Sequence, residues 1–433
     1  TTPGGHDPIL EIKLATPLPL ALGGAWLART LGPLWLAIFA VTLGLNALAT
    51  GRLAGRAGRL AAWGRVHPAQ ALLATAALAV AMQCHPVLLF GKSFVSPNNN
   101  VYLLYDTFPT VPGYTSTDLE DAPGVDVGAM MWTHMYLPVI EREALLQHAE
   151  LPLWNRYDLT GVPLLGQGQS MFGDPLNWLT LAANGASWAW DARFLVIRVL
   201  FAFGTGQAVW LLARHLGAAL LTTVSVVYIG FFAFRFNHSA ILSLCWSPWI
   251  LVAWCWLLEA RTSRARNLSL LALIVAHAGL MNSGTIKEAY MLTACLDLAG
   301  VFLVLGAAEP WPARLGRLAA AALAGVVFAL LMAPQWIAFL DALRKSHTHY
   351  DIPSAAQLPP WLFIGFFEDL FYRQLRPQEV HFDPSSNLVM LLGLLWAFIG
   401  AREHFTNRRF VAIFAAALLP FALVFGLIPA AWI

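Results

Sequence analysis

The sequence predicts an all-α integral membrane protein with about ten transmembrane helices. Hydrophobic residues make up 58% of the 433 residues and charged residues only 12%, whereas a soluble domain carries about 25% charged residues. Uncharged apolar runs close to the ~20 residues needed to cross a bilayer recur along the chain. The apolar–polar alternation over ~10 residues that is typical of an outer-membrane barrel is absent from the sequence.

The apolar runs place the expected spans in order along the chain. They lie near residues 31–50, 69–90, 194–213, 217–234, 240–258, 268–284, 289–307, 318–337, 387–401 and 410–429. The sequence begins without Met and stops inside an apolar run, so we expect a segment of a longer protein.

The loops between the expected spans differ in charge. Every second loop is rich in arginine, as in GRLAGRAGRLAAWGR, RTSRAR, ARLGR and REHFTNRR. The loops on that side hold only the acids Glu259, Glu309 and Glu403, and nearly all other acids fall on the opposite side. The positive-inside rule therefore places the arginine-rich loops in the cytoplasm and both ends of this segment outside.

This topology divides the chain into two parts. Residues 1–68 form an N-terminal external segment, an extra span and an arginine-rich loop, and residues 69–433 form the main membrane module. The module carries two long external loops, 91–193 and 338–386, and long ordered loops are usually functional. In the first loop we expect two short surface helices, the second with Pro138 in its first turn.

A polar, turn-rich stretch interrupts the apolar pattern at residues 151–179, LPLWNRYDLTGVPLLGQGQSMFGDPLNWL. It resembles the signature of the bacterial YfhO-like membrane proteins, which belong to the GT-C superfamily of glycosyltransferases. NHSAILSLCWSPWILVAW, GLMNSGTIKEAY and APQWIAFLDALRKSHTHY resemble further segments of that family. The third departs from the family pattern, because Gln335 follows Pro334 and because His347 or His349 stands where an Arg is common. The resemblance covers residues 70–430, and only its first motif is specific.

The resemblance implies a GT-C-like fold in a bacterial inner membrane, with the main loops extracytoplasmic. It also implies that a sugar passes from a polyprenyl phosphate to an envelope polymer or lipid, with membrane lipid as a further partner and no nucleic acid. Two alternatives stay open. One is a catalytically silent GT-C-like subunit of a larger membrane complex, and the other is a transporter in which Asp297 lines a path. The internal repeat expected of many transporters is not visible in the sequence.

Such an enzyme needs a base that accepts the proton of the acceptor hydroxyl. Asp126 is the first choice, because it opens an expected surface helix where the family's external-loop acid lies, and an N-cap is its structural alternative. Asp118 and Asp121 are nearby competitors. Asp174 precedes Pro175, so it is expected in an extended or turn conformation. Its carboxylate is predicted to bind sugar hydroxyls or a metal, or to cap the turn.

Cationic side chains at the external edges of the spans are candidates for the donor phosphate. They are Lys287, Arg344, Lys345, Arg235 and His238. Snorkelling or contact with lipid headgroups is the structural alternative for these residues.

Other polar and aromatic residues are expected to contact the sugar or to shape the loop. They are Trp154, Asn155 and Glu288, with Asp158 as a weaker acid candidate. The structural alternative for Trp154 is the aromatic belt at the membrane interface. The sequence identifies no certain cofactor and leaves a divalent metal ion open, although no matching carboxylate spacing accompanies His347 and His349.

Overall fold

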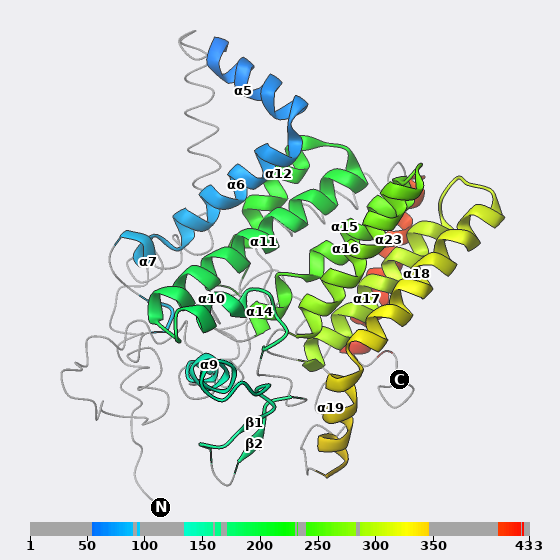
Figure 1. The fold of residues 1–433 in the computed structure, drawn as a ribbon. Helices are drawn as coiled ribbons and strands as arrows, with labels where there is room; N and C mark the ends of the chain where they lie inside the picture. Colours follow the sequence, from blue (N-terminus) through cyan, green and yellow to red (C-terminus); the bar gives the residue numbers. More distant parts are fainter. Residues whose placement is uncertain are drawn as a thin grey trace, which may run out of the picture.

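The computed structural model describes residues 54–89, 93–95, 134–158, 161–165, 171–229, 232, 240–282, 286–345, 406–425 and 427. Within these ranges the chain is mainly helical and contains one two-stranded sheet (Figure 1). The elements are α5 (Ala54–Val66), α6 (Pro68–Gln83), α7 (His85–Leu89), α9 (Leu137–Gln147), β1 (Trp154–Asn155), β2 (Val162–Pro163), α10 (Asn177–Ala182), α11 (Ser187–Ala213), α12 (Leu216–Ser225), η4 (Val226–Tyr228), α14 (Ala240–Leu244), α15 (Ser247–Glu259), α16 (Ser263–Met281), α17 (Ile286–Leu305), α18 (Trp311–Leu331), α19 (Ala333–Lys345) and α23 (Arg408–Val424).

Three helical segments in the described part of the chain are long and apolar enough to cross a bilayer. They are Ser187–Ala213, Ile241–Glu259 and Trp311–Leu331. The prediction of a helical membrane protein is thus supported at this coarse level. All of the expected spans except 31–50 and 387–401 fall on helices, and those two lie outside the described residues. The number of spans and the GT-C topology stay predictions.

Proline divides two of the expected spans. Within the span expected at 240–258, the two turn residues Cys245 and Trp246 separate α14 from α15, and Pro248 lies in the first turn of α15, while the whole segment Ile241–Glu259 is still long enough to cross a bilayer. The span expected at 318–337 is also not continuous, because α18 ends at Leu331 and α19 begins two residues later with Pro334 in its first turn. Proline lacks the N–H that a helix interior needs, so it is tolerated at a helix start. The predicted bounds of this span were therefore wrong.

α11 packs against α6, α12 and α15, and α15 in turn packs against α16 and α17 (Figure 1). Small residues allow close approach in these interfaces. A Cβ atom on Gly206 of α11 would overlap the Thr223 side chain of α12, and one on Gly300 of α17 would overlap the Trp254 ring of α15. Small residues at helix contacts are typical of membrane bundles, where tight packing replaces hydrophobic driving force.

Arginine side chains tie helix ends together at one end of the bundle, which we call the arginine-rich end. Arg214 pairs with Glu259 at the end of α15, and Arg409 at the start of α23 reaches the same carboxylate at 3.5 Å. Arg317 of α18 donates from Nη2 and Nε to Glu309 at 2.8 and 2.9 Å. α9, the β1–β2 hairpin and α19 lie toward the opposite end (Figure 1). These arginine-rich loops thus share one end, as predicted, and the compartment that this end faces stays a prediction.

Candidate functional site

The polar stretch at 151–179 contains a short hairpin. β1 and β2 pair antiparallel, with Trp154 opposite Pro163 and Asn155 opposite Val162. The connecting turn contains Gly161, whose φ of +103° lies in the region that favours glycine. The Trp154 indole covers this glycine so closely that a Cβ atom there would overlap the ring. Glycine is therefore required at this position by backbone conformation and by packing.

The two hairpin residues that the sequence singled out have different environments. Asn155 is buried at 2% exposure, and its Oδ1 accepts a hydrogen bond from the Tyr157 backbone N–H at 2.9 Å. The predicted loop-shaping role of Asn155 is thereby supported. Trp154 is 54% exposed, so its ring is accessible on one side. Whether that ring meets a sugar or the membrane interface stays a prediction.

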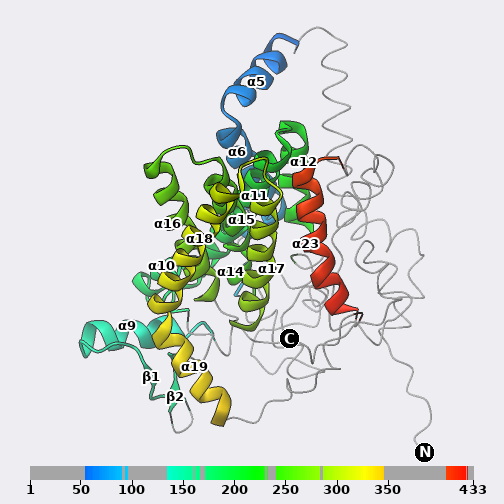
Figure 2. The ribbon, with the colours of Figure 1, turned by 90° about the vertical axis from the view of Figure 1, so that its right-hand side faces the viewer.

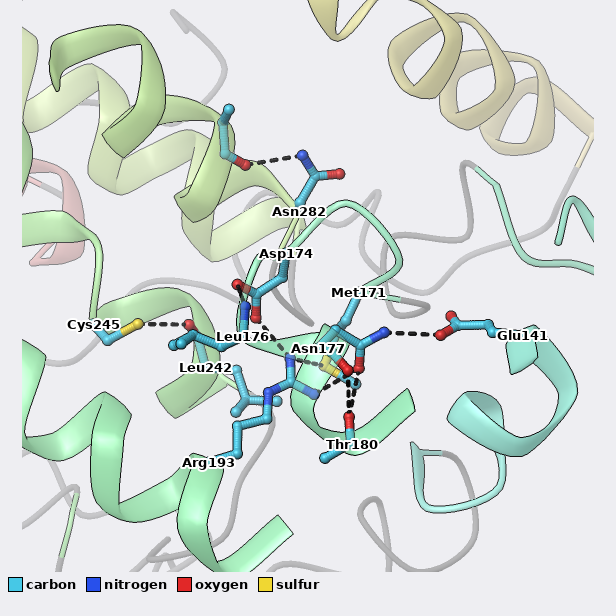
Figure 3. A network of polar contacts seen from close by, with 11 residues as sticks. Glu141, Met171, Asp174, Leu176, Asn177, Thr180, Arg193, Leu242, Cys245 and Asn282 are labelled. Carbon is cyan, nitrogen blue, oxygen red and sulfur yellow. Dashed lines mark hydrogen bonds and ion pairs between the residues drawn. The ribbon is translucent and has the colours of Figure 1, made fainter. Parts of the chain in front are cut away.

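Asp174 is fully buried and forms an ion pair with Arg193 of α11 (Figure 3). Arg193 Nη2 donates to Asp174 Oδ2 at 2.6 Å, and the Leu176 backbone N–H donates to Asp174 Oδ1 at 3.1 Å. The turn-capping alternative is therefore confirmed. Both carboxylate oxygens are engaged inside the protein, so this arrangement gives no support to a sugar-binding or metal-binding role for Asp174.

The ion pair extends into a buried polar network that joins α9, α10 and α11 (Figure 3). Arg193 Nη1 donates to Asn177 Oδ1 at 2.8 Å, and Asn177 Nδ2 donates to Glu141 Oε2 at 2.8 Å. Thr180 Oγ1 also donates to Asn177 Oδ1, at 3.0 Å. The Arg193 guanidinium lies 5.2 Å from the centre of the Trp190 ring, which is a cation–π distance. Asn177 is thus the residue through which all three helices are connected.

Glu141 is the second buried carboxyl group of the network. Burial raises its pKa to about 8, against the opposing effects of the Asn177 hydrogen bond and the Arg193 charge. The carboxyl group is therefore mainly protonated at neutral pH. Burial also raises the pKa of Asp174, and the Arg193 charge and the hydrogen bonds to the carboxylate oppose that rise. Glu141 and Arg193 were not among the residues predicted from the sequence, although each is a charged residue within a strongly apolar chain, which is a signal that could have found them.

The same stretch also contacts the end of α16. A Cβ atom on Gly173 would overlap the Asn282 side-chain amide. Asn282 Nδ2 donates to the Ala278 carbonyl at 3.0 Å and approaches Met332 Sδ at 3.2 Å. The polar stretch is thereby packed against the end of α16, and Asn282 in turn contacts the junction of α18 with α19.

An open hollow of about 510 Å³ lies between α9 and the hairpin. Its lining residues are Tyr136, Val139, Ile140, Glu143, Asn155, Tyr157 and Asp158. The Tyr136 hydroxyl donates to Asp158 Oδ2 at 3.2 Å, and the Tyr157 hydroxyl donates to Glu143 Oε1. The hydrogen bond from Tyr157 lowers the pKa of Glu143, so Glu143 is ionised at neutral pH. The hollow therefore combines hydrogen-bonding carboxylates and phenols with two aliphatic side chains.

The remaining predicted site residues are only partly covered by the described residues. Asp126, Arg235 and His238 lie outside them. Lys287 and Glu288 belong to the first turn of α17, and the structure describes only the backbone of these two residues.

Arg344 and Lys345 occupy the last turn of α19, and both are exposed. Lys345 Nζ pairs with Asp341 Oδ2 at 2.7 Å, one helical turn away. Only these two of the five predicted phosphate-binding side chains belong to the described part of the chain, so the phosphate-binding set stays a prediction. No group of three or more His, Cys, Asp or Glu side chains in those residues is arranged to hold a metal ion.

Asp297 lies in α17 within the helical bundle, and its side chain is 36% exposed. Its Oδ1 accepts a hydrogen bond from Trp254 Nε1 of α15 at 2.8 Å, and its Oδ2 lies 3.0 Å from His277 Nε2 of α16. An acid within a membrane helix is a functional candidate by default. Here, its contacts join α15, α16 and α17, which supports the structural alternative.

Comparison of the chain with known protein families, with curated proteins and with solved structures found no match. The likeness to YfhO-like proteins, and the GT-C fold that it implies, therefore stay predictions from the sequence motifs.

Proposed function

We propose that this chain is a membrane glycosyltransferase that moves a sugar from a polyprenyl phosphate to a cell-envelope acceptor at the extracytoplasmic face. The observation that carries the proposal is the hollow between α9 and the hairpin. It lies at the end of the bundle opposite the arginine-rich end, and part of its wall comes from the stretch that resembles the family signature.

The lining of the hollow suits a polyhydroxy ligand. Its volume of about 510 Å³ falls within the ~300–1,000 Å³ of small-molecule sites. Carboxylates accept hydrogen bonds from sugar hydroxyls, and phenols both donate and accept them. Val139 and Ile140 offer an apolar surface to the C–H face of a sugar ring. We therefore assign the hollow to a sugar.

The charge of the hollow argues against the donor phosphate as its occupant. Glu143 and Asp158 line it, and carboxylates repel a phosphate at short range. In the proposed mechanism the phosphate is held instead by the cations named from the sequence, of which Arg344 and Lys345 are exposed at the end of α19. Sugar and phosphate would then be bound by different parts of the external surface.

The proposed reaction is a single displacement with inversion. Asp126 accepts the proton of the acceptor hydroxyl, and the acceptor oxygen forms a bond to the anomeric carbon. The bond from that carbon to the phosphate oxygen breaks, and its electron pair leaves with the polyprenyl phosphate. Positive groups stabilise the charge that develops on the leaving phosphate.

The test of the proposal is sugar transfer by the purified protein in liposomes that contain a radiolabelled polyprenyl-phosphate sugar and an envelope-lipid acceptor. The Asp126→Asn variant should lose about 10²–10⁴-fold in rate, the usual contribution of a general base. Glu150→Gln is the matched control, because Glu150 is an exposed external acid paired with Arg156 and should transfer at the wild-type rate. Full activity of Asp126→Asn would overturn the assignment of the base.

A second variant addresses the hollow itself. Asp158→Asn keeps the shape of the side chain and can still accept from Tyr136, but it removes a charge that would bind sugar hydroxyls. We expect a higher KM for the polyprenyl-phosphate sugar with kcat little changed. Folded wild-type protein that transfers no sugar from a panel of polyprenyl-phosphate donors would favour the alternative of a silent structural subunit.

A further inference from the structure

A groove of about 500 Å³ lies between α17 and α23 at the arginine-rich end of the bundle. Its lining residues are Phe302, Leu305, Gly306, Arg408, Val411, Ala412 and Ala415. α17 and α23 lie side by side in both views (Figures 1 and 2). The lining residues come from the end of α17 and from α23, so the groove follows the contact of the two helices.

The shape of the groove follows from residue size and helical spacing. Arg408, Val411, Ala412 and Ala415 recur at intervals of three and four residues, so they share one face of α23 and extend along about 10 Å of the helix. The alanines leave space on that face. Gly306 directly follows α17 and lies next to the start of α23, because a Cβ atom there would be in ordinary van der Waals contact, at 3.7 Å, with the Arg408 carbonyl oxygen. The result is a narrow apolar channel open along one side.

The arginines near this groove are used in different ways. Arg409 contacts Glu259 and donates to the Leu211 carbonyl at 3.0 Å, and Arg314 donates to the Leu305 carbonyl at 2.8 Å. Arg408 is exposed, and among the described residues its guanidinium has no hydrogen-bond or ion-pair partner. Arg408 is also the single charged residue in the described lining of the groove. One cation is therefore available at the end of an otherwise apolar channel.

We propose that an anionic phospholipid binds in this groove, with its headgroup phosphate on the Arg408 guanidinium and the upper part of one acyl chain between α17 and α23. The planar guanidinium donates paired hydrogen bonds that match a phosphate. The apolar wall next to it suits hydrocarbon, and basic pockets between membrane helices are typical sites for anionic headgroups. Water-soluble anions lack the chain that would fill the channel, and an uncharged lipid lacks the charge that Arg408 complements. This site lies at the end of the bundle opposite the proposed sugar site, so the inference does not depend on glycosyltransferase activity.

The test is native mass spectrometry of the full chain in detergent, titrated with phosphatidylglycerol or with phosphatidylcholine of the same acyl chains. We expect saturable, tighter binding of phosphatidylglycerol. Arg408→Ala should weaken it roughly five- to tenfold, as expected for the loss of one arginine near a headgroup. Arg266→Ala is the matched control, because Arg266 is an exposed arginine in another arginine-rich loop and does not line the groove. Equal losses in the two variants would overturn the site and indicate general surface attraction.

A second variant tests the hydrocarbon half of the site without a change in charge. Ala415→Leu should fill the channel and weaken phosphatidylglycerol binding while leaving the thermal unfolding temperature near that of the wild type. If this variant does not fold, the wild-type protein provides the test through its binding of two ligands that carry the same phosphate. Wild-type protein should then prefer the two-chain lipid to glycerol phosphate, which carries the same phosphate without a chain. Displacement of phosphatidylglycerol by equimolar glycerol phosphate would overturn the proposal and indicate a simple anion site.

Discussion

Arg193 and Asp174 meet at 2.6 Å with both side chains fully buried, and this pair fixes the polar stretch at 151–179 to α11. The pair is part of a larger network, because Arg193 also reaches Asn177 and, through it, Glu141. A guanidinium at this position satisfies one charged carboxylate and one amide oxygen at once. The polar stretch is therefore held by buried polar contacts as well as by apolar packing.

Removal of one partner of this pair should strongly destabilise the protein. Asp174→Leu leaves the Arg193 charge buried without its partner, which typically costs about 3–5 kcal/mol. The double variant Asp174→Leu with Arg193→Met removes both charges and should recover much of the loss. Thermal unfolding in detergent measures both effects. A single variant as stable as the wild type would show that Arg193 finds another partner or gains access to water.

The raised pKa of Glu141 predicts a pH dependence with a definite sign. Between its ordinary value and about 8, the folded protein holds this proton and the unfolded chain releases it. Stability due to this group should therefore be highest at low pH and should fall as the pH rises toward 8, by at most about 1.4 kcal/mol per pH unit.

Glu141→Gln supplies the measurement for this dependence. The amide keeps an acceptor for Asn177 Nδ2 and cannot ionise. Unfolding temperatures recorded from pH 5 to 9 should fall less for this variant than for the wild type, with Glu150→Gln as a control that retains the full slope. Identical slopes in the wild type and Glu141→Gln would contradict the burial of an ionisable Glu141.

The contacts of Asp297 predict a structural effect on the bundle. Asp297→Ala removes the acceptor of Trp254 Nε1 and the partner of His277, and leaving such groups buried costs about 1–3 kcal/mol. Asp297→Asn keeps an acceptor for the indole and should cost less. Thermal unfolding of the two variants gives their order, and the reverse order would argue that the charge of Asp297 is not paired as described.

Two glycines should respond in opposite ways to replacement by alanine. Gly161→Ala places a Cβ at φ +103° and against the Trp154 ring, so it should destabilise the hairpin by more than about 1 kcal/mol. Gly58 of α5 has open space around its Cβ position, so Gly58→Ala should be neutral or stabilising by up to about 1 kcal/mol. Limited proteolysis of the 151–165 region reads out the first effect. Equal protease sensitivity of the two variants would contradict the described turn.

The sequence predicted features that depend on local patterns. Apolar runs located the helices, Pro138 in the first turn of α9 was confirmed, and Asp174 before Pro175 was placed in a turn that it caps. The partner of Asp174 could not be predicted, because Arg193 lies on a separate helix and pairs with it only after tertiary packing. Glu143 was missed for the same reason. Glu143 lines the hollow because α9 packs beside the hairpin, and the spacing of residues in the sequence does not predict that contact.

The contact between Gly173 and Asn282 has a mechanical consequence. Residues 171–180 are anchored on one side by the buried guanidinium of α11 and on another by the amide at the end of α16. A displacement of this segment would have to drag two long helices with it. We therefore expect residues 171–180 to keep a fixed position relative to α11 and α16.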